Sequence, residues 1–285
     1  MALQIRYETD VDSFRSRVTP FLSEKEAENN LPLGIIAGIV NGVQQFSDES
    51  PLLLSVEDKN RVQLVAIRTP PRRLILSTSA SASAVSFLAR ELHSARYIVP
   101  GVTAPSYEAE MFGRAWTGLS RARMRRVQSQ RIYRLDGVIP QRPVAGSLHL
   151  CDARNAEDVA FAGDWMVAFN RDVGEDQAPP DPMRFMGQRD EGLFFWKLER
   201  PVSMVAFSGP TPNGIRIGWV YTPPELRGRG YASAGVAAVS QLMLDRGRKF
   251  CFLYTDLANP TSNHIYQEIG YRPVCDATVW DFESE

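Results

Sequence analysis

Apolar and polar residues alternate in the first half of the chain as expected for strands interleaved with amphipathic helices. A strand is predicted where every second residue is apolar, and a helix where apolar residues recur every three to four positions. The predicted strands are 4–7, 52–56, 62–68, 73–77 and 124–136. The predicted helices are 11–42, interrupted at Pro20 and near Pro32, then 83–95 and 106–123, with a loop at 99–102.

The second half repeats this order. Residues 155–171 predict a helix, and a loop rich in Gly, Pro and acidic residues follows at 172–182. The remaining predictions are a hairpin of strands 192–198 and 202–208, a strand at 215–221, a helix at 231–246 and a continuously apolar, buried strand at 250–255. The fold class is therefore α/β (α+β), and 285 residues with 44% hydrophobic content are enough for two domains.

The most informative segment lies between the strand 215–221 and the helix that follows it. It reads Arg227-Gly228-Arg229-Gly230-Tyr231-Ala232. Glycines allow the backbone to approach a ligand closely, and the N-terminus of the next helix attracts anions. The two arginines favour phosphate in particular. An ordinary glycine-rich connection with solvated arginines is the alternative interpretation.

Two common nucleotide motifs do not fit this loop. No Gly-Lys-Ser/Thr follows, so the loop is not Walker A. Ser233 stands where the dinucleotide fingerprint requires a glycine or alanine, and the acidic residue of that motif is missing as well.

The loop does resemble the Arg/Gln-x-x-Gly-x-Gly/Ala motif of the GNAT N-acetyltransferase superfamily, with Arg227, Gly230 and Ala232 on its defining positions. A second block, residues 256–271, is similar to the family pattern Asn-x-x-Ala/Ser-x-x-Leu/Ile-Tyr-x-x-x-Gly-Phe/Tyr. Its named positions are filled by Asn259, Ser262, Ile265, Tyr266, Gly270 and Tyr271. Two blocks in the right order identify residues 145–285 as a GNAT-like domain.

The resemblance implies a mixed-sheet acetyltransferase domain that uses acetyl-CoA as co-substrate. It places the coenzyme pyrophosphate at residues 227–232 together with Ser233. It assigns the pantetheine arm and acetyl carbonyl to the backbone of Val220, Tyr221 and Thr222, and the pantetheine also to Asn259. Tyr266 would stand beside the sulfur, where a phenol can protonate the leaving thiolate. Packing of Tyr266 in the core is the alternative.

The first half resembles the degenerate N-terminal half of two-domain bacterial GNAT proteins. The resemblance rests on Pro-Gly-Val at 100–102, the helix that carries Trp116, and Arg131–Leu135 before a Val-Ile-Pro hinge. It implies a non-catalytic GNAT-like domain over residues 1–140. The segment 138–144, with two prolines, is the expected linker.

The charge pattern suggests a rival function. The net charge of −1 gives no overall preference for nucleic acid, but eight arginines lie between Gly113 and Arg142. A non-catalytic acyl-CoA sensor or scaffold could use this basic stretch, 114–142, to hold a partner. A solvated protein face is the simpler interpretation, so we do not expect nucleic-acid binding.

The remaining candidate chemistry is weakly specified. Cys151, Cys251 and Cys275 and the three histidines fit no disulfide framework or metal spacing, so we predict packing thiols and no metal. Glu175, Asp176 and Glu191 are candidates for the general base, beside a water chain or a base supplied by the substrate. No signal segment or long apolar run is present, which predicts a cytoplasmic protein without membrane contact.

The acceptor is expected to be a small-molecule or peptide amine of unknown identity, attacked directly in a ternary complex. Transfer of a longer acyl chain, or from aminoacyl-tRNA, stays open. The oligomeric state is not encoded in any recognised motif, and a homodimer is compatible with the sequence.

Overall fold

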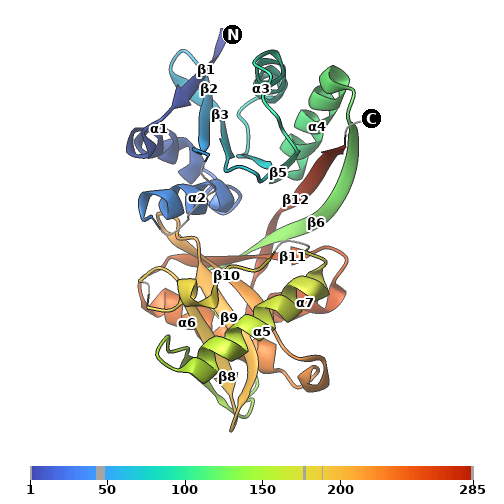
Figure 1. Cartoon of the computed structure of the whole chain (residues 1–285). Helices are drawn as coiled ribbons and strands as arrows, with labels where there is room; N and C mark the ends of the chain where they lie inside the picture. The colour runs from blue at the N-terminus through green and yellow to red at the C-terminus, as the bar shows by residue number, and fades with distance from the viewer. Residues whose placement is uncertain (1, 43–48, 176–177, 188, 284–285) are drawn as a thin grey trace. The chain divides into compact units, whose positions relative to one another are not determined.

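The structure is a computed structural model, and it describes residues 2–42, 49–175, 178–187 and 189–283. The chain divides into two compact units. Unit 1 comprises 1–132, 255–259 and 273–285, and unit 2 comprises 133–254 and 260–272. The two units are described separately below, with the element labels of Figure 1.

Unit 1 is built on a mixed sheet with the strand order β1-β2-β3-β4-β5-β12-β6. The pairings from β1 to β4 and between β5 and β12 are antiparallel, whereas β4 and β5 run parallel. The strands are β1 (Leu3–Glu8), β2 (Leu52–Asp58), β3 (Arg61–Arg68), β4 (Leu74–Leu76), β5 (Gly101–Pro105), β6 (Arg123–Leu135) and β12 (Arg272–Glu283).

Helices cover both faces of this sheet (Figure 1). One face packs on α1 (Val11–Ser23) and α2 (Asn30–Val40), the other on α3 (Ala82–Ser94) and α4 (Ser106–Ser120). Strand β3 shows why: Val65 and Ile67 enter the α1/α2 core, while the alternate residues of the strand enter the α3/α4 core. Both faces are buried, which explains why the strands are apolar almost throughout.

Unit 2 has the strand order β11-β10-β9-β8-β7, in which β10 and β11 are parallel and the other pairs antiparallel. Helix α5 and the turn η1 cover one face, and α6 and α7 the other. The strands are β7 (Ser147–Leu150), β8 (Gly192–Lys197), β9 (Pro201–Ser208), β10 (Gly214–Tyr221) and β11 (Phe250–Asp256). The helices are α5 (Ala156–Val173), η1 (Pro182–Phe185), η2 (Pro224–Leu226), α6 (Tyr231–Asp245) and α7 (Pro260–Ile269).

The two halves of the chain repeat one succession of elements. The run β4-α3-β5-α4-β6 in the first half matches β10-α6-β11-α7-β12 in the second, and in each the first two strands are parallel neighbours. The α/β class and the two-domain repetition predicted from the sequence are therefore confirmed.

The last strand of the chain belongs to unit 1. Residues Ala277–Asp281 of β12 pair antiparallel with Pro105–Gly101 of β5, and Asp281 accepts an ion-pair hydrogen bond of 2.5 Å from Arg73 Nε. Conversely, Tyr133 and Leu135 at the end of β6 are buried in the α6/α7 core of unit 2. The contact division thus differs from the ranges 1–140 and 145–285, because strand pairing over long sequence distances is invisible in local patterns.

Several element predictions are corrected by the structure. Helix α1 runs through Pro20, because Phe14, Val18 and Leu22 bury one continuous face while the proline is exposed. The interruption falls at residues 24–29 instead. Residues 101–105, expected to begin as a loop, form the parallel strand β5. Strand β7 and turn η1 were not predicted, since each spans only four residues.

The position of β12 generates a stability prediction. A Cβ at Gly101 would lie 2.2 Å from the carbonyl oxygen of Trp280, so Gly101→Ala must displace the β5–β12 ladder. We expect the free energy of unfolding to fall by about 2 kcal/mol in denaturant titration. Gly118→Ala, at an exposed position of α4 with nothing within 4 Å of the added Cβ, is the matched control and should instead gain about 0.5–1 kcal/mol. Equal effects of the two changes would contradict the pairing.

Candidate functional site

The most unusual feature of unit 2 is the early separation of β10 from β11. The parallel ladder joins only Gly214–Arg216 to Phe250–Phe252. Beyond Arg216, the register of β10 against β9 also shifts between Gly218 and Tyr221, and Trp219 adopts a positive φ of 51°. Such a bulge re-aims the strand. Backbone groups at the end of β10 are thereby freed from the ladder with β11, at the edge where open α/β sheets bind ligands.

Side chains hold this bulge in place. The Trp219 ring lies 5.1 Å from Phe169 of α5 and 6.2 Å from Phe185 of η1, measured between ring centroids. Ser203 Oγ donates a 3.0 Å hydrogen bond to the carbonyl of Tyr221, and Thr222 Oγ1 donates to Ser203 Oγ at 2.9 Å. Residues 220–222 are therefore the fixed end of the bulged strand. The contacts that fix them offset the energetic cost of the positive φ at Trp219, a bulky residue.

The loop 227–232 has the backbone of an anion site. Gly228 and Gly230 have φ of 74° and 80°, and Gly230 is the N-terminal cap of α6. The first helical bond runs from Ala234 N to the Gly230 carbonyl at 2.9 Å. Within the described residues, no protein group accepts a hydrogen bond from the N–H groups of 228–233. Six consecutive donors and the positive end of a helix dipole are therefore available to a ligand.

Charge around the loop agrees with this arrangement. No acidic residue occupies the first turn of α6, and both Arg229 and Gly228 are exposed. Ser233, in that first turn, is half-buried. A phosphate could therefore meet backbone donors and an arginine without a competing carboxylate on the helix.

Arg227 has a second task that the sequence pattern did not indicate. Its Nε donates to the Thr222 carbonyl at 2.9 Å, and its Nη2 pairs with Asp172 of α5 at 2.5 Å. Its guanidinium lies 6.0 Å from the ring centroid of Tyr221. Arg227 therefore braces the loop against the end of β10 and against α5. Thr222 is only five residues away, but Asp172 lies 55 residues from Arg227, so no local pattern could reveal that ion pair.

Tyr266 lies on α7 within the α6/α7 core and is 8% exposed. Its phenol makes no hydrogen bond to any other described residue, and its ring meets Tyr271 edge-on at 6.0 Å. Burial raises the pKa of Tyr266 from 10.0 to about 12. The phenol thus stays protonated at neutral pH and is a proton donor rather than a nucleophile.

Asn259 immediately precedes α7, and its N–H donates to the Asp256 carbonyl at 3.0 Å. It lies at the N-terminal start of that helix, as the Asn-Pro pair indicated, and the contact division assigns it to unit 1. Asn259 and Tyr266 are only seven residues apart in the sequence, but they belong to different contact units.

The three candidate bases differ in their surroundings. Glu191 is buried, and both of its carboxylate oxygens accept hydrogen bonds from Arg184, at 3.0 and 3.1 Å. Glu191 is thus engaged in a structural ion pair with Arg184. Glu175 follows α5 and donates its N–H to the Asn170 carbonyl at 2.9 Å. Asp176 lies outside the described residues.

The cysteines are poor nucleophiles. Burial raises the pKa of Cys251 and of Cys275 to about 12, and that of Cys151 is raised as well by burial and by Asp158. Among the described residues, no cluster of three or more His, Cys, Asp or Glu side chains has an arrangement that could hold a metal ion. None of the described helices is long and apolar enough to cross a membrane.

Within the described residues, ion pairs engage at least four of the eight arginines in the basic stretch 114–142. Arg131 pairs with both oxygens of Asp276, at 2.6 and 3.1 Å, and Arg125 pairs with Asp281 at 2.7 Å. Arg114 and Arg134 pair with Glu110 and Asp136. The strand β12 supplies the acids for the first two pairs, so what appears as a basic run in the sequence is a strand matched to an acidic neighbour.

Unit 1 contains a loop in the corresponding place, but its backbone donors at residues 78–80 are occupied. After β4, Thr78 N donates to Asn29 Oδ1 and Ser79 N to Glu108 Oε1, both at 2.8 Å. Ala80 N donates to the Gln63 carbonyl at 2.8 Å. The protein's own side chains and backbone thus fill the position that is open in unit 2.

Comparisons with known proteins agree with this architecture. Residues 198–281, which contain both motifs, match the family described as FR47-like protein. A solved structure of a GCN5-related N-acetyltransferase from Kribbella flavida has a TM-score of 0.56 at 16% identity, covering 78% of this chain and 88% of that one. No curated protein matches the chain.

Two further structures match along the whole chain. A tandem GNAT protein from the clavulanic acid biosynthesis pathway has a TM-score of 0.59 at 12% identity, and a Drosophila protein has 0.69 at 11%; each match covers 98% of both chains. At these identities the likeness concerns the fold. The two-domain GNAT-like fold expected from the sequence is thereby confirmed.

The raised pKa of Tyr266 predicts an alkaline effect on stability. The folded state holds this proton more tightly than the unfolded state. The contribution of the phenol to the free energy of unfolding is therefore complete below pH 10 and is lost as pH rises toward about 12. Tyr266→Phe removes that loss. Relative to wild type, the variant's free energy of unfolding should improve by about 1 kcal/mol between about pH 9 and about pH 11. Parallel pH profiles in denaturant titrations would contradict the buried, protonated phenol.

Proposed function

We propose, from the tandem GNAT fold, that unit 2 transfers an acetyl group from acetyl-CoA to a primary amine in a ternary complex. The single observation that carries the proposal is the set of unpaired N–H donors at residues 228–233. A nest of this kind at a helix N-terminus fits a pyrophosphate, and its glycines leave room for one.

The thioester supplies the activated acetyl group. The residues of this chain would bind the coenzyme, orient its acetyl group and protonate the leaving thiolate. The loop 227–232 with Ser233 would bind the pyrophosphate. Backbone groups of Val220, Tyr221 and Thr222 would hold the pantetheine arm and polarise the acetyl carbonyl. This role is compatible with the early end of the β10–β11 ladder. Asn259 would contact the pantetheine, as the family resemblance implies.

Tyr266 would donate its proton to the leaving thiolate. A phenol of pKa about 12 is a weak acid for an ordinary thiolate in water. Burial, however, also raises the pKa of a thiol, as it does for Cys251 in the same core, to about 12. In a desolvated site the phenol of Tyr266 and the thiol of the leaving group would therefore have similar pKa values. The amine's proton would leave through water or Glu175, since Glu191 is held by Arg184.

A non-catalytic acyl-CoA sensor is the second candidate. Its partner surface was the basic stretch 114–142, and the ion pairs of Arg125 and Arg131 with β12 leave that surface less cationic than the sequence suggests. Unit 1 would be non-catalytic under both proposals, because Asn29 and Glu108 occupy the donors of its loop.

Gly230→Glu tests the cofactor site. Gly230 has a φ of 80°, and a Cβ there would lie 3.1 Å from Val144, so a carboxylate at this position would crowd the nest and repel phosphate. Calorimetry should show acetyl-CoA affinity falling at least about hundredfold, because several charge-assisted hydrogen bonds would be lost. Gly42→Glu, also at a positive φ but with open space around it, is the control for strain and charge. Wild type that fails to bind acetyl-CoA, or a variant that binds it equally well, would refute the site.

Tyr266→Phe tests the proton donor. With the ring retained, we expect kcat to fall about 100-fold while acetyl-CoA affinity stays within a few-fold, since general acid catalysis is worth about 10²–10⁴. The readout is release of free thiol in the presence of a panel of primary amines. Equal losses in affinity and kcat would make Tyr266 a packing residue. A complete lack of turnover by wild type, with salt-sensitive RNA binding, would favour the sensor.

A further inference from the structure

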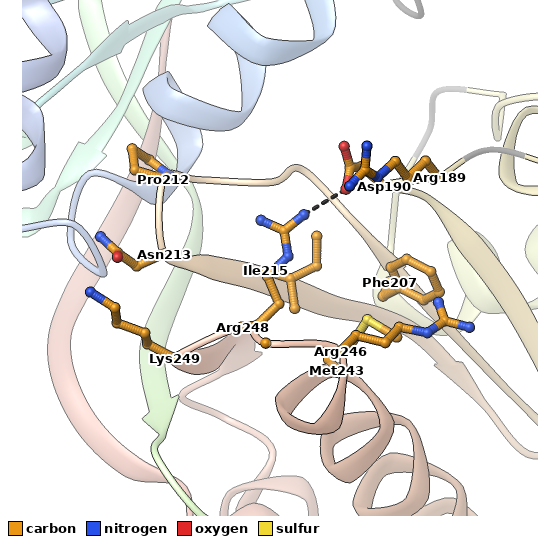
Figure 2. A pocket seen from close by; sticks show the side chains of 11 residues that line it. Arg189, Asp190, Phe207, Pro212, Asn213, Ile215, Met243, Arg246, Arg248 and Lys249 are labelled. Atoms are coloured by element: carbon orange, nitrogen blue, oxygen red, sulfur yellow. Dashed lines mark hydrogen bonds and ion pairs between the residues drawn. The ribbon is translucent and has the colours of Figure 1, made fainter.

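A cavity lies in unit 2 at the end of α6 opposite the loop 227–232. It has a volume of about 730 Å³ and is lined by the turn after α6, the start of β10 and residues before β8 (Figure 2). Helix α6 has 15 residues, so at 1.5 Å per residue its two ends are about 20 Å apart. The cavity is therefore separate from the proposed pyrophosphate site.

Basic side chains dominate the walls of this cavity. Arg246, Arg248 and Lys249 come from the turn after α6, and Arg189 comes from the segment before β8. Figure 2 shows Arg248 between Lys249 on one side and Arg246 on the other. Asp190 is the one acidic residue of the lining.

That carboxylate neutralises only one of the four cations. Arg248 Nη2 pairs with Asp190 at 2.5 Å, and Arg248 Nη1 donates to the Thr211 carbonyl at 3.3 Å. Within the part of the chain that the structure describes, Arg189, Arg246 and Lys249 form no ion pair. An arginine carries five N–H donors, so Arg248 also keeps donors beyond these two bonds. The lining residues carry a net positive charge.

The negative end of the α6 dipole does not cancel this charge. Three of the last four carbonyls of the helix, those of Leu242, Met243 and Leu244, already accept hydrogen bonds of 2.9–3.1 Å from the backbone N–H groups of residues 246–248. These bonds satisfy the carbonyls that a helix C-terminus otherwise exposes. An anion in the cavity would meet cations rather than free carbonyl oxygens.

The floor of the cavity holds a small apolar patch among polar walls. Phe207, Ile215 and Met243 line it and are each at most 3% exposed. The guanidinium of Arg246 lies 5.8 Å from the Phe207 ring centroid, so a flat cationic surface adjoins this floor. A volume of about 730 Å³ is within the range of small-molecule sites.

We propose that this cavity is a second ligand site, which binds a phosphate monoester with an apolar or aromatic body. The phosphate would be held by Arg246, Arg248 and Lys249, and the body would cover the floor at Phe207 and Met243. Arginine and lysine donors suit a phosphate dianion better than a carboxylate, because more bonds and more charge are available to it. The site is independent of acetyl transfer.

The methyl group of Met243 reports directly on occupancy. The chain is labelled with ¹³C at its methionine methyls, Met243→Leu assigns the signal, and inorganic phosphate and phenyl phosphate are titrated in turn. We expect a saturable shift of the Met243 signal with both probes, and tighter binding of phenyl phosphate. If neither probe gives a saturable shift, the site is refuted. If the two probes bind with equal affinity, the proposal that the ligand has an apolar body is refuted.

Substitutions of opposite sign test the charges. Arg246→Gln and Lys249→Gln should each weaken phenyl phosphate binding about fivefold, which corresponds to about 1 kcal/mol. Asp190→Asn should tighten it, because a repelling carboxylate is removed while the side chain keeps its size. Lys59→Gln, an exposed lysine in unit 1, should leave the affinity unchanged. Affinities that do not respond to Arg246→Gln or Lys249→Gln, or weaker binding by Asp190→Asn, would contradict the site.

One further variant separates this cavity from the loop 227–232. Gly230→Glu should leave the Met243 shift intact, since it acts at the other end of α6. If it abolishes the shift, the probe binds at the loop and the second site is refuted. Conversely, failure of acetyl-CoA binding with a retained Met243 shift would refute the proposed function alone.

Discussion

The geometry of unit 2 depends on the point at which β10 and β11 stop pairing. A parallel ladder that continued past Arg216 would satisfy the backbone of β10 and leave no opening at its end. The bulge at 218–221 re-aims the strand, and its positive φ at Trp219 is tolerated because Phe169, Phe185 and Ser203 fix the surrounding side chains and carbonyl. Arg227 then ties the following loop to the same strand end. The unpaired end of β10 and the position of the loop 227–232 are therefore parts of one local distortion.

The two units keep one topology but differ in how the donors of the corresponding loop are bonded. Unit 1 retains the parallel pair β4–β5 and the crossover helix α3, but its loop donors bond to Asn29, Gln63 and Glu108. Glu108 is buried and comes from α4, the helix that corresponds to α7 of unit 2. A carboxylate from that helix thus takes the place of an external anion. Buried polar groups need partners, and the chain itself can supply them.

Local patterns in the sequence were sufficient for the glycine-rich loop 227–232 and for the elements around it. The glycines at 228 and 230 are required by positive φ, and the helix that follows has a clear apolar face, so both could be predicted. The partners of Arg227 and the place of β12 could not, because Asp172 lies 55 residues from Arg227 and β5 about 170 from β12. The acidic partners of Arg125 and Arg131 were equally invisible, because Asp276 and Asp281 come from the distant strand β12. Pro20 was read as a break, although a continuous buried face outweighs one missing hydrogen bond.

Desolvation sets the acid–base properties of the α6/α7 core in one direction. Tyr266, Tyr271 and Cys251 all have raised pKa values because burial disfavours their charged forms. A thiolate generated against this core would meet the same penalty, so it would take a proton more readily than in water. A protonated phenol without a hydrogen-bond partner in the described chain is then suited to supply that proton. The proposed proton transfer would depend less on a specially acidic donor than on an environment that makes the leaving group a stronger base.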